Sequence, residues 1–302
     1  AVGLNSQLSY SRDFENEADR LGVQNLESAG FDVRGMPAFF ERLQKNSRLY
    51  ENNAPAYMRT HPLTADRISE MENRVMNKPY RQVPDSLDFQ LVRAKLRVMA
   101  GPSKDVIDSF TTQLRGRSAA VAARYGLALA YLQAKRLPEA DRALAELRKT
   151  GAAAPMIEGL AGELRLAHKD PDGAVVVFRE GRSRYPQALN LLYGEVGALI
   201  DARRPAEALA VLKPEIQTTP DNANLWELQA RAESAQGRIL AQHRSLAEVY
   251  AIQGNYAAAA EQLSLAQKAG DGDFFEQSAV DSRQREIRAL LVEQARQARE
   301  QR

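Results

Sequence analysis

The chain has 302 residues, of which 44% are hydrophobic and 26% are charged, a composition typical of a folded globular protein. Its 41 Lys and Arg residues nearly balance its 39 Asp and Glu residues, and a net charge of +2 argues against a nucleic-acid-binding surface. The absence of cysteine excludes disulfides and thiolate metal sites. The sequence has no apolar run long enough to span a bilayer, and its first residues do not have the pattern of a signal peptide.

Residues 1–82 are predicted to form a helical unit without internal repeats. Helices are expected at residues 12–28, 36–45 and 64–76. Ala29 and Gly30 predict a turn after the first helix, and Pro79 and Pro84 predict a linker to the rest of the chain.

Two carboxylates on the first predicted helix are candidates for a functional site. Glu15 and Asp19 are four positions apart, so a helix projects both from one face, with about 5–6 Å between their Cβ atoms. One such carboxylate can bind a metal ion while the other orients a neighbouring ligand. From spacing alone, the simpler interpretation is a solvated acidic face paired with Arg12 and Arg20.

The pattern Arg12-x-x-Glu15-x-x-Ala18-Asp19 resembles the third-ligand helix of zinc peptidases of the CAAX-prenyl-protease and HtpX superfamily. This resemblance implies that Glu15 is a zinc ligand and that Asp19 orients the ligands without binding the metal itself. It also implies that the intact parent protein binds zinc.

A second motif follows at Thr60-His61-Pro62 and ends at Arg67, and it resembles the His-Pro-x-x-x-x-Arg segment that closes over the active site in the same family. The resemblance places His61 at or near the open metal position and Arg67 near the substrate carbonyl, where it stabilises negative charge. The alternative for His61 is a residue that caps the following helix.

The main departure from the family is that HExxH, the motif that provides two histidines and the general base, occurs nowhere in the chain. The only histidines are His61, His168 and His243, and the last two are expected to be surface or packing residues of other helices. A catalytic zinc site uses three protein ligands and an open position for water. We therefore expect the chain to be the downstream part of a peptidase, inactive by itself and without tightly bound zinc.

Residues 83–272 contain a repeat of 34 residues. Ala140, Ala174 and Ala208 are spaced by 34, and so are Pro186 and Pro220. A small residue at this period, where two antiparallel helices cross, is typical of tetratricopeptide repeats. The units are placed at residues 87–120, 121–154, 155–188 and 189–222, although a helical hairpin array with accidental spacing is the alternative.

The phase slips after residue 222, where one helix at about 238–252 is predicted to end one unit and begin the next. Residues 273–302 are predicted to form a capping helix, with one apolar face on the array and one polar face in water. The predicted fold class is therefore all-α, a partial peptidase domain followed by a repeat superhelix.

The inner surface of such a superhelix suits polypeptide binding. By repeat phase, the first helices direct four candidate binding residues to that surface, although packing explains each of them equally well: Tyr125, Glu163, Asn190 and Tyr193. The combination of both parts resembles periplasmic proteases that act on misassembled envelope and outer-membrane proteins. The second hypothesis is a non-catalytic scaffold or chaperone whose partners are polypeptides.

Overall fold

The structure, a computed structural model, describes residues 2–48, 65–116 and 121–300, with only the backbone for 2–12 and 46–48. These residues form fifteen α-helices and no strand, which confirms the all-α prediction. Contacts divide the chain into two units, Ala1–Asp85 and Ser86–Arg302. No helix in the described ranges has both the length and the apolar character needed to cross a bilayer.

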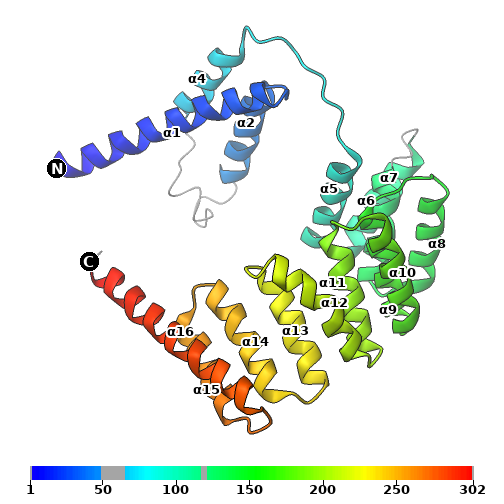
Figure 1. Ribbon diagram of the computed structural model, residues 1–302. Coiled ribbons are helices and arrows are strands. Elements are labelled where there is room, and N and C mark those ends of the chain that lie inside the picture. Colours follow the sequence, from blue (N-terminus) through cyan, green and yellow to red (C-terminus); the bar gives the residue numbers. More distant parts are fainter. Residues whose placement is uncertain (1, 49–64, 117–120, 301–302) are drawn as a thin grey trace. The chain divides into compact units, whose positions relative to one another are not determined.

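The first unit contains three described helices (Figure 1): α1 (Val2–Ser28), α2 (Gly35–Arg48) and α4 (Ala65–Val75). Helix α1 begins well before the predicted start at Arg12, because no proline interrupts the preceding residues. It ends at the predicted turn, where Gly30 has φ +81° and the Phe31 N–H donates to the Leu26 carbonyl at 2.9 Å. Glycine suits this helix end because it has no Cβ to oppose a left-handed backbone.

A small apolar core holds the three helices together. Its buried residues are Val23, Val33, Phe40, Ile68, Met71 and Val75. Met71 is completely buried. The core therefore aligns the start of α4 with the middle of α1, where the candidate carboxylates lie.

The second unit is a series of helices in consecutive pairs (Figure 1). The pairs are α5 (Leu87–Ala100) with α6 (Ser103–Arg115), α7 (Val121–Gln133) with α8 (Leu137–Arg148), α9 (Pro155–Ala167) with α10 (Pro171–Arg184), α11 (Leu189–Asp201) with α12 (Pro205–Thr218), α13 (Ala223–Ala235) with α14 (Ile239–Ile252), and α15 (Tyr256–Lys268) with α16 (Phe274–Glu300).

The small residues of the repeat lie where the sequence spacing predicts. Ala140, Ala174 and Ala208 are at most 1% exposed. The ring of Phe178 lies against two glycines, Gly162 of its own pair and Gly194 of the next, so it fills the space between consecutive pairs. Small residues at these positions allow the close packing that the array requires.

Overpacking at one of these positions is expected to destabilise the array. Replacing Ala174 with leucine inserts three carbon atoms at a site with no exposed surface, so we expect unfolding free energy to fall by about 1–3 kcal/mol. Urea unfolding followed by circular dichroism measures this change. An unchanged midpoint would contradict the packing assigned to Ala174.

The repeat also appears in the backbone of the turns. Lys135, Lys169, Arg203 and Gly237 end the first helix of four successive pairs, and each has φ between 57° and 72°. Their spacing is again 34 residues. In the first of these turns the Arg136 N–H donates to the Tyr131 carbonyl at 2.9 Å, which terminates the helix. A left-handed residue at this position therefore sets the turn, even where the residue is not glycine.

The array of helix pairs has an inner and an outer side. The first helices of successive pairs (α5, α7, α9, α11 and α13) contact one another directly. The second helices α6, α8, α10 and α12 each contact the first helix of the following pair. Because the first helices pack side by side, they form the inner side of the curved array, and the second helices form the outer side.

After residue 222 each helix packs against its neighbours along the chain. Helix α14 packs against both α13 and α15, with Ala241 and Ala247 buried. The second helices α10 and α12 also contact both of their neighbours, so the shared role predicted for the helix at about 238–252 stays a prediction. Helix α16 buries Val280, Gln284 and Ile287 while most of its other residues are exposed.

Candidate functional site

The structure joins the two motifs of the first unit through Arg67. The guanidinium of Arg67 donates from Nε to Asp19 Oδ2 at 2.8 Å and from Nη2 to Asp19 Oδ1 at 2.8 Å. Its third nitrogen, Nη1, lies 2.9 Å from Glu15 Oε2. One arginine on α4 therefore holds two carboxylates on α1 in a fixed arrangement.

This cluster is largely shielded from water. The side chains of Arg67, Glu15 and Asp19 are 12%, 14% and 8% exposed, respectively. The Arg67 guanidinium also lies over the ring of Phe40, 5.5 Å from its centroid. Two parallel hydrogen bonds to one carboxylate are among the stronger charged interactions in proteins, particularly where water is excluded. In the sequence Phe40 gives no indication of this role, because a phenylalanine on an amphipathic helix indicates only core packing.

The local sequence explains why these groups meet. On α1, Glu15 and Asp19 continue the helical stripe that places Val23 in the core. On α4, Arg67 directly precedes Ile68, whose side chain packs in the same core. The apolar contacts of this core therefore bring Glu15 and Asp19 of α1 close to Arg67 of α4.

The simpler interpretation of an acidic solvated face does not hold for Asp19, which is only 6% exposed. Arg20, its expected surface partner, instead forms a pair with Glu17, with Nε 2.7 Å from Oε2. The side chain of Arg12 and all of His61 lie outside the described residues, so the predicted roles of His61 stay predictions. All three guanidinium nitrogens of Arg67 have carboxylate partners here, and its role at a substrate carbonyl also stays a prediction.

The described residues do not by themselves fit a zinc ion. Among them, no three His, Asp or Glu side chains are close enough together to hold a metal. Glu15 offers one carboxylate, and one of its oxygens is bonded to Arg67. A catalytic zinc ion needs three protein ligands, so this part of the chain lacks most of the ligand set.

The two described histidines both belong to the repeat unit. His168 Nε2 lies 2.9 Å from Asp141 Oδ2, and His243 Nδ1 lies 2.8 Å from Gln262 Oε1. Each is thus engaged with a neighbouring helix. This placement agrees with the surface or packing roles expected for them.

Two of the predicted binding residues are neighbours on the inner helices α7 and α9. Tyr125 is only 3% exposed, and burial, together with the charge of Glu163, raises the pKa of its hydroxyl. Glu163 has an accessible side chain, but the surrounding inner helices limit its hydration and raise the pKa of its carboxyl. The charge of Lys95 on α5 opposes that rise. The inner side thus carries a carboxyl that is incompletely solvated.

The other two predicted binding residues link successive pairs. Asn190 Nδ2 donates to the Pro155 carbonyl at 3.2 Å, and Asn222 Nδ2 donates to the Tyr193 hydroxyl at 2.8 Å. Asn190 is exposed, whereas Tyr193 is partly buried. Their contribution to partner binding stays a prediction.

Residues 1–75, which contain both motifs, match the family described as Peptidase family M48, and residues 165–232 match the family described as Tetratricopeptide repeat. The chain resembles an M48 peptidase joined to tetratricopeptide repeats. This finding confirms the resemblance inferred from Glu15, Asp19 and the 34-residue period.

Known proteins are similar in sequence to nearly the whole chain. The beta-barrel assembly-enhancing protease of Escherichia coli (strain K12) is 28% identical over 289 residues, which cover 94% of this chain and 58% of that protein. The putative beta-barrel assembly-enhancing protease of Vibrio cholerae is 28% identical over 98% of this chain and 61% of its own length. The chain therefore spans about three fifths of the length of these relatives. A tetratricopeptide repeat protein from Parabacteroides merdae aligns with 80% of this chain and 97% of its own, at 12% identity and a TM-score of 0.43.

Proposed function

We propose that this chain is the C-terminal part of a periplasmic zinc metalloendopeptidase that acts in the quality control of outer-membrane proteins. The observation that carries the proposal is the clamp of Arg67 on Glu15 and Asp19, which joins the two peptidase motifs in one buried cluster. The names of the relatives, together with their similarity along 94% of the chain or more, support the cellular role.

In this proposal the first unit contributes part of a metal site. Glu15 provides one carboxylate ligand, and Asp19 fixes its position through their shared partner Arg67. The remaining ligands come from an HExxH segment that is not in this chain. His61 lies in the second motif and is proposed to guard the open metal position.

The exposed apolar surface of the first unit supports the idea that it packs against further polypeptide. A groove of about 630 Å³ is lined by residues from α1 to α2 and by the segment after α4, most of them apolar, with Asp32, Arg81 and Gln82 among the others. Phe31 and Phe39 are each 50% exposed there, and Tyr80 is 67% exposed. A contiguous patch of this kind is uncommon on a complete globular domain and is typical of an interface.

The repeat unit is proposed to hold the polypeptide on which the peptidase acts. Its inner helices carry Tyr125, Glu163, Asn190 and Tyr193, a mixture of aromatic and polar groups that suits peptide recognition. By itself, the chain retains this binding function and does not hydrolyse peptide bonds.

A second candidate function is that of a non-catalytic scaffold or chaperone. It is favoured by one observation, the lack of any three potential ligands close together in the described ranges. Under this hypothesis the Arg67 cluster stabilises the first unit, and the repeats alone act on partners.

Metal content and proteolysis distinguish the two functions. The purified chain is expected to hold no stoichiometric zinc after gel filtration and to leave casein intact, because one carboxylate cannot enclose the ion. In a longer polypeptide that includes an HExxH segment, Glu15→Gln is expected to abolish tight zinc binding and cleavage, whereas His61→Ala changes cleavage and leaves zinc bound. The matched control is Glu17→Gln, since Glu17 is exposed and paired with Arg20.

Tightly held zinc or chelator-sensitive cleavage in the purified chain would contradict the proposed partial site. Wild-type cleavage by the Glu15→Gln form would remove Glu15 from the site. If the longer polypeptide neither binds zinc nor cleaves casein, yet still binds unfolded proteins, the scaffold function is the correct one.

A further inference from the structure

Two grooves lie next to each other on the outer side of the repeat unit, one on each side of α8. The first, of about 340 Å³, is lined by the end of α6, by α7 and by α8. The second, of about 610 Å³, is lined by α8, α9 and α10. Each therefore lies between two consecutive second helices and has a first helix as its floor.

The grooves are equivalent positions of the repeat. Four residues that line the first groove have counterparts 34 residues later in the second: Leu114 and Arg148, Leu127 and Ala161, Tyr131 and Arg165, Ala143 and Val177. The two grooves therefore both have an apolar floor, but they differ in the charged residues that line them. A single extended segment that crosses α8 can contact both.

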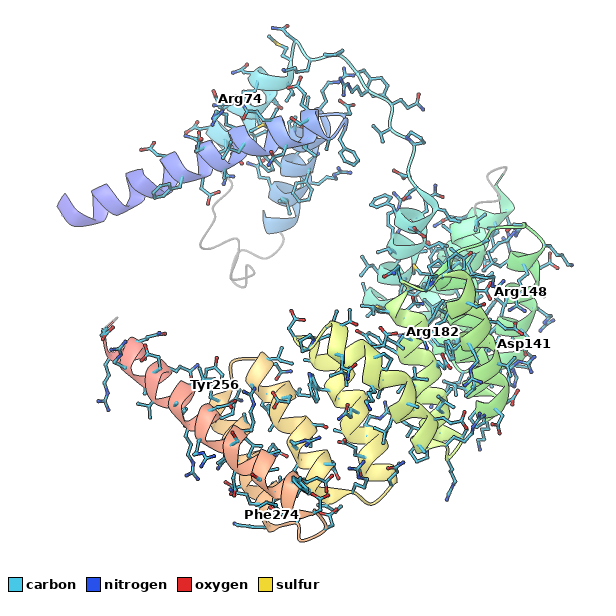
Figure 2. All side chains as sticks on the ribbon, in the orientation of Figure 1. Arg74, Asp141, Arg148, Arg182, Tyr256 and Phe274 are labelled. Atoms are coloured by element: carbon cyan, nitrogen blue, oxygen red, sulfur yellow. The ribbon has the colours of Figure 1, made fainter. Side chains whose placement is uncertain are left out.

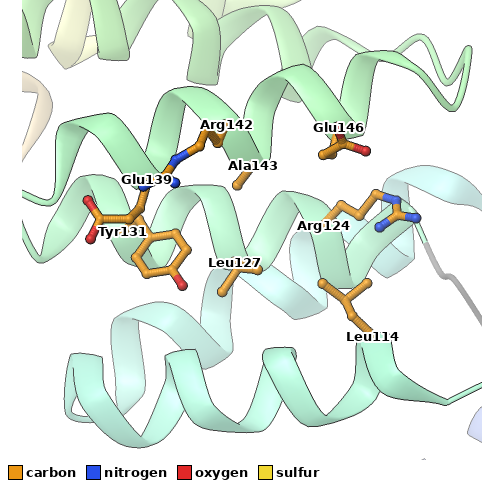
Figure 3. Close-up of a pocket in the computed structure, with 8 residues that line it drawn as sticks. All are labelled: Leu114, Arg124, Leu127, Tyr131, Glu139, Arg142, Ala143 and Glu146. Carbon is orange, nitrogen blue, oxygen red and sulfur yellow. The ribbon is translucent and has the colours of Figure 1, made fainter.

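The first groove contains an arginine without a hydrogen-bond partner at one of its donors (Figure 3). Arg124 Nε is buried and makes no hydrogen bond within the described part of the chain. Figure 3 shows Arg124 and Glu146 at one end of the groove, Tyr131 and Arg142 at the other, and Leu127 between them. A buried N–H without an acceptor is unfavourable, so Arg124 favours a ligand that brings an acceptor into this groove.

Two more arginines around α8 have no hydrogen-bonded carboxylate partner among the described residues. Arg142 Nε donates to the Pro138 carbonyl at 3.2 Å. Arg148 lines the second groove, and Figure 2 shows it on α8 together with Asp141. Guanidinium groups bind carboxylates through paired N–H donors, so these positions favour a ligand that carries carboxylates.

The carboxylates at the rims are already bound to cationic or polar groups. Glu146 accepts from Lys149 Nζ at 2.6 Å, and Glu139 accepts from Arg136 Nη2 at 2.7 Å. Asp141 lies 2.9 Å from His168 in the second groove. Lys149 and Arg136 are the main partners of Glu146 and Glu139, and the nearby Arg124 and Arg142 add to their effect in lowering the pKa of those carboxyls. The hydrogen-bond donors left for a ligand are therefore those of the guanidinium groups, and these favour an acidic partner over a basic one.

We infer that these paired outer grooves bind an acidic polypeptide segment in which carboxylates flank large apolar side chains. The apolar side chains occupy the floors at Leu127 and Leu164, and the carboxylates bind Arg124, Arg142 and Arg148. This surface lies on the outer side of the array, separate from the inner-side residues of the proposed function. A partner can therefore be held there while the inner side is occupied.

Fluorescence anisotropy with a defined probe tests this inference. The probe is the fluorescein-labelled peptide Gly-Asp-Phe-Glu-Glu-Leu-Asp-Gly, titrated with the whole chain. We expect Arg124→Gln combined with Arg142→Gln to weaken binding about tenfold or more, because two charged hydrogen-bonding groups are lost. Replacing Asp and Glu of the probe by Asn and Gln, or its Phe and Leu by Ser, is expected to weaken binding to the wild type similarly.

The charge-matched control is Arg285→Gln combined with Arg299→Gln, which removes two exposed arginines of α16 that line neither groove. It is expected to bind the probe like the wild type, and circular dichroism verifies that each variant is folded. Absence of measurable binding to the wild type overturns the inference, and so does equal weakening by the control pair. Displacement of the probe by inorganic phosphate alone would indicate a general anion site and would also overturn it.

Discussion

Replacing Arg67 with alanine is expected to destabilise the first unit by about 3–5 kcal/mol, because it leaves two largely buried carboxylates without their partner. The substitution leaves Asp19, whose side chain is 8% exposed, without the two hydrogen bonds that compensate for its charge. Glu15 loses the same partner. Hydrogen exchange of peptides from α1 and α4, read by mass spectrometry, measures the local stability of this unit.

The control for this experiment is Arg20→Ala on the same helix. Arg20 pairs with Glu17 at the surface, where both side chains are at least 39% exposed, so its loss is expected to change the stability of the unit little. Arg67→Lys retains the charge but not the paired donors, and an intermediate effect is expected. If α1 and α4 were equally protected from hydrogen exchange in Arg67→Ala and in Arg20→Ala, the buried cluster would not be what holds the two helices together.

Replacing Gly194 with alanine is expected to lower the stability of the repeat unit by about 1–3 kcal/mol. A Cβ at this position would lie 2.3 Å from Cε1 of Phe178, whose ring is 1% exposed. The ring cannot move away easily, since a Cβ at Gly162 on its other side would lie 2.3 Å from its Cζ. Urea unfolding of the whole chain, followed by circular dichroism, measures the loss.

Gly197→Ala is the matched control, because Gly197 lies in the same helix and a Cβ added there would meet no neighbouring atom within 4 Å in the described part of the chain. There the substitution is expected to increase stability by about 0.5–1 kcal/mol, as alanine restricts the unfolded chain and favours the helix. A loss of stability in Gly194→Ala together with a gain in Gly197→Ala, three positions away, would support the packing assigned to Phe178. Stabilisation by both would contradict it.

The sequence by itself determined the repeat architecture and the peptidase resemblance. Both follow from local patterns: Ala140, Ala174 and Ala208 recur at a fixed period, and the motif Arg12-x-x-Glu15-x-x-Ala18-Asp19 resembles a peptidase helix. A period of 34 identifies close helix crossings without coordinates, because only small residues fit there. The burial of all three alanines agrees with that reasoning.

Only the tertiary structure decided which groups these patterns bring together. Arg67 is 48 positions from Asp19, and no periodicity in the sequence connects them. Their pairing depends on the core around Phe40 and Ile68, which sets α4 against α1. In the same way, the free Nε donor of Arg124 arises because α6, α7 and α8 enclose it without providing an acceptor among the described residues. Sequence patterns report the face of a helix on which a residue lies, whereas the partner on that face is chosen by packing between elements distant along the chain.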